Sequence, residues 1–474
     1  NMKQDKNTIR LGLLAPLTGL VAMYGQDIAR AGQIAADLIN ESGGLLGREL
    51  EIIISDDGSL PETAVPAAKR LIQEDSCHAI IGNLLSNSRI AVSDQVSVPF
   101  RIPYLNFSFY EGSIFNRYFF NFAALPNQQI DKMIPYMAEH FGMKMYFAGN
   151  NYEWPRGSID AAKSSLERME GETVGEQYLS IGVSEDEVNW VLDGVARSGA
   201  DVFVPYFAGL DQLLMLNKFY ERGLKNHMAV VMGHYDEIMV SYLAPEIRQG
   251  LYSSNTYFMS IDTEENVQFL KRLNEYPGVT GVWPNGNGTL TNFSEATYNC
   301  VMAFAEAVSR VETTASEQLV GALESIHFRG PQGEIIMDSD THHAHVNSYL
   351  SRCNHLGQFE IVKGFGCIAP EIPTRYKDSF RIQKRNLHKP SPNDASLFAR
   401  EVAQFQRQQD DVKKILDVAN MAILATDSSG TIIAANRVTV ELFGYTENEL
   451  VGMPMRLLVP PHQRQHHDRL VEGF

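Results

Sequence analysis

The chain has 474 residues, enough for two or three domains, and 44% of them are hydrophobic, which is ordinary for a globular protein with sizeable cores. Its 40 basic and 57 acidic residues give a formal net charge of −17, which argues against a general nucleic-acid-binding protein. No apolar run in the sequence approaches the roughly 20 residues that a membrane-spanning helix needs.

The first 126 residues alternate between patterns typical of strands and of helices. Residues 8–17, 50–54 and 78–82 are apolar runs that predict buried strands. Residues 25–41 and 61–75 carry apolar side chains at helical spacing, and the second of these segments begins with a proline. This order predicts a mostly parallel sheet with helices on both faces.

A polar stretch at residues 82–111 is the main candidate for a binding site. Ser86, Asn87 and Ser88 open a helix directly after a predicted strand, and a second short strand ends near Ser108. Small ligands bind at the carboxyl ends of strands in open α/β sheets, where a helix N-terminus can hold a ligand oxygen. The alternative is that the serines only cap the helix.

The strand and helix pattern restarts at Asn127 and again places polar and aromatic residues after strands. The predicted strands 145–149, 201–205 and 229–232 are each followed by such residues: Tyr152 and Trp154, Tyr206, and Tyr235. Two sheets whose loops face each other form a cleft that can close on a ligand by a hinge motion. These aromatic residues are therefore candidates for the wall of a ligand site, although aromatic residues in loops also serve packing.

Several short motifs are spread over residues 8–370. They lie at residues 13–19, 40–44, 330–333, 341–345 and 357–359. Together they resemble the type I periplasmic-binding-protein family, and within it the branch of amide sensors and urea receptors. The resemblance implies an α/β fold of two Rossmann-like lobes with a hinge. It assigns residues 8–126 and 256–330 to lobe 1, and residues 127–255 and 331–370 to lobe 2.

The resemblance also implies which residues contact the ligand. The family's helix-capping serine corresponds to Ser86, its second hydroxyl to Ser108, and its Tyr-x-Tyr-Pro-Arg pattern to residues 152–156. Leu84, Asn106 and Trp154 stand where the family has tyrosines, so the pocket must differ in shape. The full predicted set is Ser86, Asn87, Asn106, Ser108, Tyr110, Tyr152, Trp154, Tyr206, Tyr235 and Glu237.

Glu237 and its neighbour Asp236 leave two interpretations open. Their carboxyl groups could accept hydrogen bonds from a ligand amide or pair with the ammonium group of an amino acid. Alternatively, Glu237 is a carboxylate that the dipole of a following helix favours.

No metal, cofactor or catalytic residue is predicted in this chain. His342, His343 and His345 suggest a metal site, but the family carries histidines here without a metal role, and a structural site needs four well-spaced ligands. G-x-S-x-G, P-loop and HExxH motifs are absent from the sequence. The chain is therefore predicted not to be an enzyme, although a further output domain downstream could be one.

The last hundred residues change character. Residues 371–414 predict a basic linker and then an amphipathic helix, whose heptad spacing from Phe398 to Leu416 could pair two copies in a homodimer. Residues 415–474 resemble the first half of a PAS sensory domain, with three strands still to come. His467 stands where haem-binding PAS sensors carry their proximal histidine, but PAS domains without haem keep a similar one, so haem is not predicted.

These features predict the ligand-binding sensory module of a bacterial signalling protein. It would bind a small polar solute such as a short amide or urea between the lobes and relay closure through a linker helix to the PAS region. The alternative is the solute receptor of an ABC transporter for amino acids, amides or urea. Because no predicted membrane span separates the two parts, we expect a cytoplasmic protein; a trimmed signal peptide would make it periplasmic.

Overall fold

The computed structural model describes residues 8–389 except 233, and residues 421–464 except 428 and 429. It separates into two units, residues 1–391 and residues 392–474, and each is described by itself. The predicted amphipathic helix at 398–416 and the predicted haem position His467 lie outside the described residues.

The first lobe of unit 1 is built on a parallel sheet in the strand order β2-β1-β3-β4-β5. Its strands in chain order are β1 (Thr8–Ala15), β2 (Glu49–Asp56), β3 (Ile80–Ile81), β4 (Tyr104–Asn106) and β5 (Phe119–Asn121). The crossover helices that parallel strands require cover both faces of this sheet.

Successive residues of β1 show how the two faces are filled. Leu13 packs into the core cluster that includes helices α1 (Gly25–Glu41) and α12 (Asn292–Val311). Leu14 points the other way, into the cluster that includes α2 (Pro61–Gln73). The alternation follows from the two-residue period of a strand, and it explains why both leucines are fully buried.

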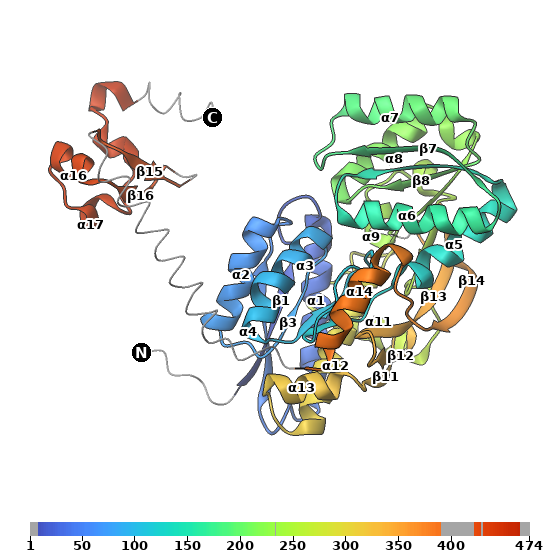
Figure 1. Cartoon of the computed structure of the whole chain (residues 1–474), viewed down its shortest axis with the longest axis horizontal. Helices are drawn as coiled ribbons and strands as arrows, with labels where there is room; N and C mark the ends of the chain where they lie inside the picture. Colours follow the sequence, from blue (N-terminus) through green and yellow to red (C-terminus); the bar gives the residue numbers. More distant parts are fainter. Residues whose placement is uncertain (1–7, 233, 390–420, 428–429, 465–474) are drawn as a thin grey trace. The chain divides into compact units, whose positions relative to one another are not determined.

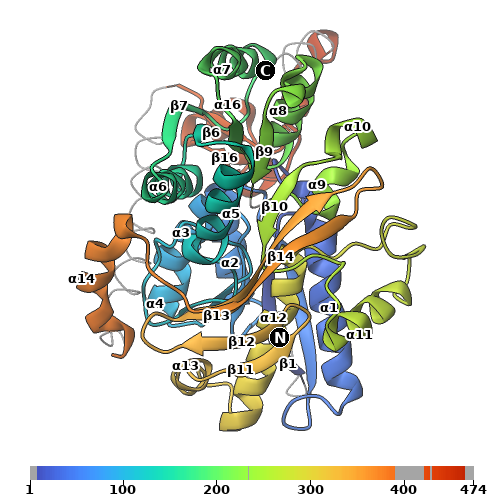
Figure 2. The ribbon, with the colours of Figure 1, turned by 90° about the vertical axis from the view of Figure 1, so that its right-hand side faces the viewer.

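The second lobe repeats this architecture with the parallel strand order β10-β9-β8-β6-β7. Its strands are β6 (Lys144–Asn150), β7 (Glu172–Leu179), β8 (Val202–Tyr206), β9 (Ala229–Met232) and β10 (Tyr252–Asn255). Both ribbon views place this lobe, drawn in green, apart from the blue elements of the first lobe (Figures 1 and 2). Its main helices are α5 (Pro126–Phe141), α6 (Glu153–Arg168), α7 (Glu185–Ser198) and α8 (Gly209–Glu221).

One long strand, β13 (His343–Cys353), belongs to both lobes. At its start His343 pairs in parallel with β5, and its later residues pair antiparallel with β10 and with β14 (Phe359–Ile368). The predicted two-lobed α/β fold is thus confirmed, with the lobes joined through a shared strand. The predicted boundary at residue 330 groups β12 (Gly333–Asp338) with lobe 2, whereas its partners are β11 (His327–Gly330) and the start of β13.

Shorter helices complete unit 1, and the described part of unit 2 holds a hairpin, two short α-helices and two short 3-10 helices. In unit 1 these are α3 (Ser86–Val92), α4 (Val98–Phe100), α9 (Glu237–Ser241), α10 (Pro245–Arg248), α11 (Glu264–Asn274), α13 (Ser316–Leu323) and α14 (Lys377–Leu387). In unit 2 the hairpin pairs β15 (Leu424–Thr426) with β16 (Ile432–Ala435), and the α-helices are α16 (Arg437–Phe443) and α17 (Glu447–Leu450). Among the described helices, none combines the length and hydropathy of a membrane span.

The central position of Leu13 makes a direct test of this packing. Leu13→Ala should lower the free energy of unfolding by about 2–5 kcal/mol, because it leaves a cavity between β1 and α1 that the surrounding side chains cannot fill. Urea unfolding followed by tryptophan fluorescence measures this in unit 1 alone, since all three tryptophans (Trp154, Trp190 and Trp283) lie there. Leu17→Ala is the control, because Leu17 is 43% exposed and its loss should cost less than about 0.5 kcal/mol.

Candidate functional site

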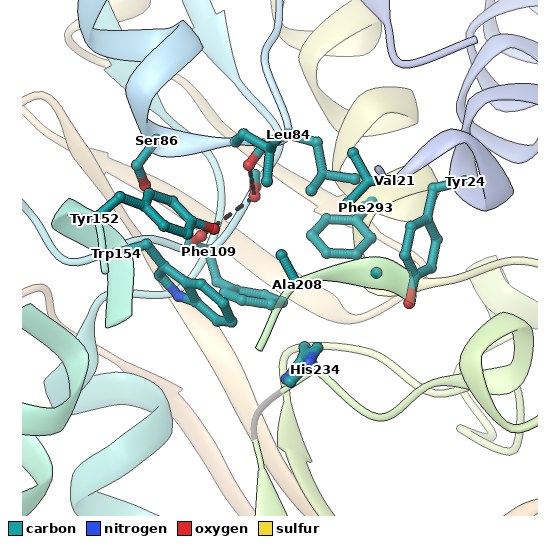
Figure 3. A pocket seen from close by; sticks show the side chains of 13 residues that line it. Val21, Tyr24, Leu84, Ser86, Phe109, Tyr152, Trp154, Ala208, His234 and Phe293 are labelled. Carbon is teal, nitrogen blue, oxygen red and sulfur yellow. Dashed lines mark hydrogen bonds between the residues drawn. The ribbon is translucent and has the colours of Figure 1, made fainter. Parts of the chain in front are cut away.

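A pocket lies between the loops of the two lobes, where the carboxyl ends of their strands meet (Figure 3). Loops after β1, β3 and β4 of the first lobe line one part, and those after β6, β8 and β9 of the second lobe line the other. The lining residues are Val21, Tyr24, Leu84, Leu85, Ser86, Ser108, Phe109, Tyr152, Trp154, Ala208, Gly209, His234 and Phe293. This is the position that parallel α/β topology favours for a ligand.

The pocket is tightly filled by its own side chains. The space between its atoms is about 330 Å³, which includes space open to solvent. Only about 20 Å³ of that space can be reached by the centre of a water molecule, little more than one water needs. The described arrangement is therefore a closed one, and a ligand larger than a few atoms enters only if the lobes part or aromatic side chains move.

Aromatic rings form most of the wall. The ring of Trp154 lies 5.5 Å from that of Tyr206, 5.3 Å from that of His234 and 5.8 Å from that of Phe109, measured between centroids. Phe109 in turn lies 5.1 Å from Phe293, which belongs to the first turn of helix α12. Rings at these separations attract one another and offer flat apolar surfaces to a ligand.

Four of the predicted site residues, Ser86, Ser108, Tyr152 and Trp154, line this pocket. The two hydroxyl groups are already engaged: Ser86 Oγ donates to Glu111 Oε2 at 2.7 Å, and Ser108 Oγ donates to the carbonyl of Leu84 at 2.9 Å. The alternative that Ser86 caps α3 is wrong, because the cap residue is Leu85 and no side-chain cap bond forms there. A ligand must therefore compete with Glu111 for the Ser86 hydroxyl.

The buried guanidinium of Arg89 shapes this side of the pocket. It donates to the carbonyls of Asn83 and Leu84 at 2.7 Å each and to Ser86 Oγ at 3.1 Å. Burial lowers the pKa of Arg89, and the neighbouring Glu111 carboxylate opposes that shift. Arg89 thus fixes the loop between β3 and α3 from behind the pocket wall.

The other predicted residues are not among those that line the pocket. The Asn106 amide donates to Ser108 O and Asn121 Oδ1, both at 2.7 Å, and Asn87 accepts from its neighbour's backbone N–H. Tyr110 binds His343 through its hydroxyl, and the two rings stack. These side chains hold the loops together behind the wall.

The remaining predicted tyrosines, Tyr206 and Tyr235, are buried in the second lobe. The Tyr235 hydroxyl accepts a hydrogen bond from Gln212 Nε2 at 3.0 Å. The Tyr206 hydroxyl is buried and has no hydrogen-bond partner among the described residues. Because the Tyr206 ring contacts that of Trp154, a movement of the indole would also shift the Tyr206 ring and its hydroxyl.

Two buried carboxyl groups, those of Asp236 and Glu237, follow β9 of the second lobe. The Tyr24 hydroxyl donates to Asp236 Oδ1 at 3.3 Å and so joins the two lobes, while Glu237 Oε1 accepts from the backbone N–H of Met259 at 2.8 Å. Asp236 Oδ2 and Glu237 Oε2 are buried and have no partner in the part of the chain that the structure describes. Burial raises the pKa of Glu237 to about 8 and the pKa of Asp236 well above its usual value.

Glu237 is the first residue of α9, as the helix-terminus alternative requires, and Asp236 caps this helix because its Oδ1 accepts from Met239 N at 2.8 Å. That role uses only one of its two oxygens. The free oxygens of Asp236 and Glu237 remain available to an N–H group of a ligand.

His234 lines the pocket but was not predicted from the sequence. Burial lowers its pKa to about 3, so the imidazole is neutral. Its Nε2 lies 2.8 Å from the carbonyl of Phe207 and therefore carries the proton. Its Nδ1 is then a buried acceptor, without a partner among the residues described.

The residues that the sequence did not reveal are mostly apolar. Val21, Tyr24, Phe109 and Phe293 line the pocket, as do Leu85, Ala208 and Gly209. Polar side chains at strand ends indicate a ligand site, and these apolar residues lack that signal. The available signal was positional, because Tyr24, Phe109 and Gly209 each follow a predicted strand within about ten residues.

One group of side chains in the described residues could hold a metal ion. Ligand atoms of Glu324, His342 and His388 all lie within 4.8 Å of one another, and His342 Nε2 is 2.9 Å from Glu324 Oε1. A metal-bound histidine normally donates its other N–H to an acceptor, whereas His342 Nδ1 is buried without a partner among the described residues. The group fits a hydrogen-bonded cluster better than a metal centre.

The sequence patterns of two families match this chain. The pattern described as "Periplasmic binding protein" matches residues 8–358, and the one described as "PAS fold" matches residues 410–474. The Leu/Ile/Val-binding protein BraC3 of Rhizobium johnstonii is 40% identical over 86 residues, which are 18% of this chain and 23% of that protein. Leu/Ile/Val-binding protein homolog 8 of Brucella abortus is 24% identical over 344 residues, which are 69% of this chain and 82% of that protein.

Solved structures with the same fold include two with bound ligands. A solute-binding protein of an ABC transporter from Rhodopseudomonas palustris, in complex with p-hydroxybenzoic acid, has a TM-score of 0.67 at 19% identity, covering 76% of this chain and 98% of that one. The branched-chain amino acid transporter substrate-binding protein LivJ from Streptococcus pneumoniae, in complex with isoleucine, has a TM-score of 0.64 at 19% identity, covering 77% and 100%.

The raised pKa of Glu237 predicts a pH-dependent stability. The native state holds the proton up to about pH 8, whereas an unfolded glutamate releases it near 4.5, so stability is lost as the pH rises between these values. The stability advantage of Glu237→Gln over the wild type should therefore grow from pH 5 to pH 8, by at most about 1.4 kcal/mol per pH unit.

Urea unfolding at four pH values in this range measures the difference. Glu246→Gln is the control, because this carboxylate is exposed and its replacement should shift all four values equally. Parallel stability curves for Glu237→Gln and the wild type would show that Glu237 is ionised in the native state throughout.

Proposed function

Because this chain belongs to the periplasmic binding protein family, we propose that its two lobes close on a small organic solute and that the closure is passed on as a signal. The relatives named above are binding proteins, which carry out no chemistry on their ligands. The observation that carries the proposal is the pocket lined by strand-end loops of both lobes, beside buried polar atoms without partners among the described residues.

The chemistry of the pocket supports a ligand with two parts. Asp236 and Glu237 lie outside the residues that line the closed pocket, and each has a buried carboxyl oxygen without a partner among the described residues; such carboxyl groups suit the polar end of an amide, urea or amine once the lobes rearrange around it. Trp154, Phe109 and Phe293 offer flat apolar surfaces that suit a planar or branched body. The amide-sensor resemblance of the sequence makes a short amide or urea the first ligand class to test in this pocket.

Aliphatic amino acids and aromatic acids are the competing ligand classes, since the named relatives and structures carry them. A thermal-shift panel separates the classes: acetamide, propionamide and urea in one arm, leucine and isoleucine in a second, and benzoate and 4-hydroxybenzoate in a third. A bound solute stabilises the native state and raises the melting temperature in a concentration-dependent way.

A sensor and a transport receptor are both consistent with such a pocket. The match of residues 410–474 to the PAS fold supports the sensor, because PAS modules occur in signalling proteins. The resemblance to solute-binding proteins of ABC transporters supports the second candidate, a transport receptor. A ligand that changes the hydrogen exchange of residues beyond 391, or the self-association of the chain through these residues, would favour the sensor.

Trp154 is the best single residue with which to test the pocket. Trp154→Ala should weaken binding of the compound that gives the largest thermal shift by about 2 kcal/mol, roughly thirtyfold in Kd, because it removes a buried aromatic wall. Isothermal titration calorimetry measures the affinity. Trp190→Ala is the matched control, since Trp190 is 58% exposed on α7, and equal affinities in the two variants would place the ligand elsewhere.

Glu237 should distinguish an ammonium group from an amide. An ammonium group that displaces the proton of Glu237 gains a charge-assisted hydrogen bond worth about 1.5–3 kcal/mol, which Glu237→Gln removes, whereas the substitution costs a neutral amide about 1 kcal/mol or less. Calorimetric titration of the variant with leucine and with propionamide compares the two losses. Equal losses for both compounds would contradict direct contact between Glu237 and the nitrogen of the ligand.

A further inference from the structure

We infer that Tyr376 acts as a strap between the lobes, so that closure of the pocket fixes helix α14 and opening releases it. The inference rests on the proposed function, because it assigns the element that carries the closure signal. It concerns residues 374–388, which follow the last strand of the binding unit and precede the remainder of the chain.

Helix α14 is anchored to the first lobe. The ring of Phe380 lies 5.1 Å from that of Phe115, and Arg117 Nη1 donates to the carbonyl of Leu387 at 3.2 Å. Leu387 itself is fully buried, and His388 Nδ1 lies 3.4 Å from Glu324 Oε1. The helix therefore moves with the first lobe.

Tyr376 joins the start of this helix to the second lobe. Its hydroxyl donates to Glu153 Oε1, and Arg375 Nε lies 3.8 Å from the same oxygen. Glu153 is the first residue of α6 and stands between Tyr152 and Trp154, which line the pocket. The strap thus contacts the segment of the second lobe that would move when the pocket opens.

Gly157 on α6 lets Tyr376 pack closely against the second lobe, so this packing depends on the position of the lobe. A Cβ atom at Gly157 would lie 2.5 Å from the Tyr376 hydroxyl and 2.7 Å from Glu111 Cβ, so only a glycine lets these groups meet on α6. Glu111 accepts the hydrogen bond from Ser86 in the pocket wall. Glu111 and Tyr376 thus both lie against Gly157, and Glu111 joins this point of α6 to Ser86 in the pocket wall.

Separation of the lobes must break this arrangement. Glu153 and Gly157 belong to α6 of the second lobe, whereas Glu111 and the anchors of α14 belong to the first, so the two sets cannot stay in contact when the lobes part. Opening removes the hydrogen bond and the buried environment of Tyr376, which is 8% exposed in the closed form. The first turn of α14 then loses its attachment to the second lobe.

Hydrogen exchange of the full chain tests the strap without a ligand. Tyr376→Phe removes the hydrogen bond to Glu153 and should speed exchange of the α14 amides about tenfold. Tyr178→Phe is the matched control, because it removes a Tyr–Glu hydrogen bond of 2.8 Å elsewhere in the second lobe and should leave α14 unchanged. Equal α14 exchange in Tyr376→Phe and the wild type overturns the inference.

A substitution that forces the lobes apart gives a second test. A Cβ at Gly209 would lie 2.2 Å from the carbonyl of Leu20 in the other lobe, so Gly209→Ala should part the lobes and speed exchange in α14. Exchange of the Leu210 amide, which donates to Leu20 O across the cleft at 3.3 Å, reports the opening itself. Gly182→Ala is the control, since Gly182 also has a positive φ but open space around it.

The outcomes separate this inference from the proposed function. Faster exchange of Leu210 with unchanged α14 in Gly209→Ala overturns the strap, whether or not a solute binds. Faster exchange of both, with no thermal shift from any compound of the panel, supports the strap and contradicts the proposed ligand classes.

Discussion

The parallel pairing of strands in both lobes is the constraint on which the site depends. Parallel strands bring all their carboxyl ends to one edge of a sheet, so each lobe can present its variable loops in only one direction. Strand β13 pairs with β5 at one end and with β10 at the other, and thereby fixes the two sheets relative to each other. The loops of both lobes then line one shared pocket, as seen around Trp154 and Tyr24.

The sequence predicted the positions of these loops well because strand and helix periodicity is a local property. The predicted helix at residues 25–41 is α1 with the same bounds, and the predicted segments after β3, β4 and β6 all reach the pocket. The division of β13 between the lobes was not predictable in this way. A single extended run of residues gives no sign of which sheet each half will join.

The prediction that polar residues contact the ligand was limited by a different physical effect. A buried polar group must find a partner, and in this fold the nearest partners of Asn106 and Tyr110 are Asn121 and His343 rather than a ligand. Sequence spacing locates a side chain on a loop but not the partner that it reaches across the fold. The apolar residue Phe109, between the two, lines the pocket instead.

The polar atoms without partners therefore carry more information than the polar residues as a class. A buried oxygen such as Glu237 Oε2, for which the described residues supply no donor, costs about 1–3 kcal/mol relative to a bonded one. A ligand N–H that reaches it recovers this free energy only when the lobes are closed around the ligand. The ligand then binds the closed form more tightly than the open form, which is the condition for it to shift the equilibrium between them.

The polar contacts across the cleft are of a strength that permits such a shift. The Tyr24–Asp236, Leu210–Leu20 and Tyr376–Glu153 hydrogen bonds each contribute on the order of 1 kcal/mol, because water replaces them when the lobes open. A few such bonds leave the open form populated rather than excluded. A change of about 5.5 kcal/mol moves a two-state equilibrium from about 1:99 to 99:1. One or two buried hydrogen bonds to the ligand, together with one stacked ring, supply a free energy close to this value. Because the Tyr376–Glu153 bond is one of these few bonds, the free energy by which a ligand favours the closed form also favours the attached state of α14.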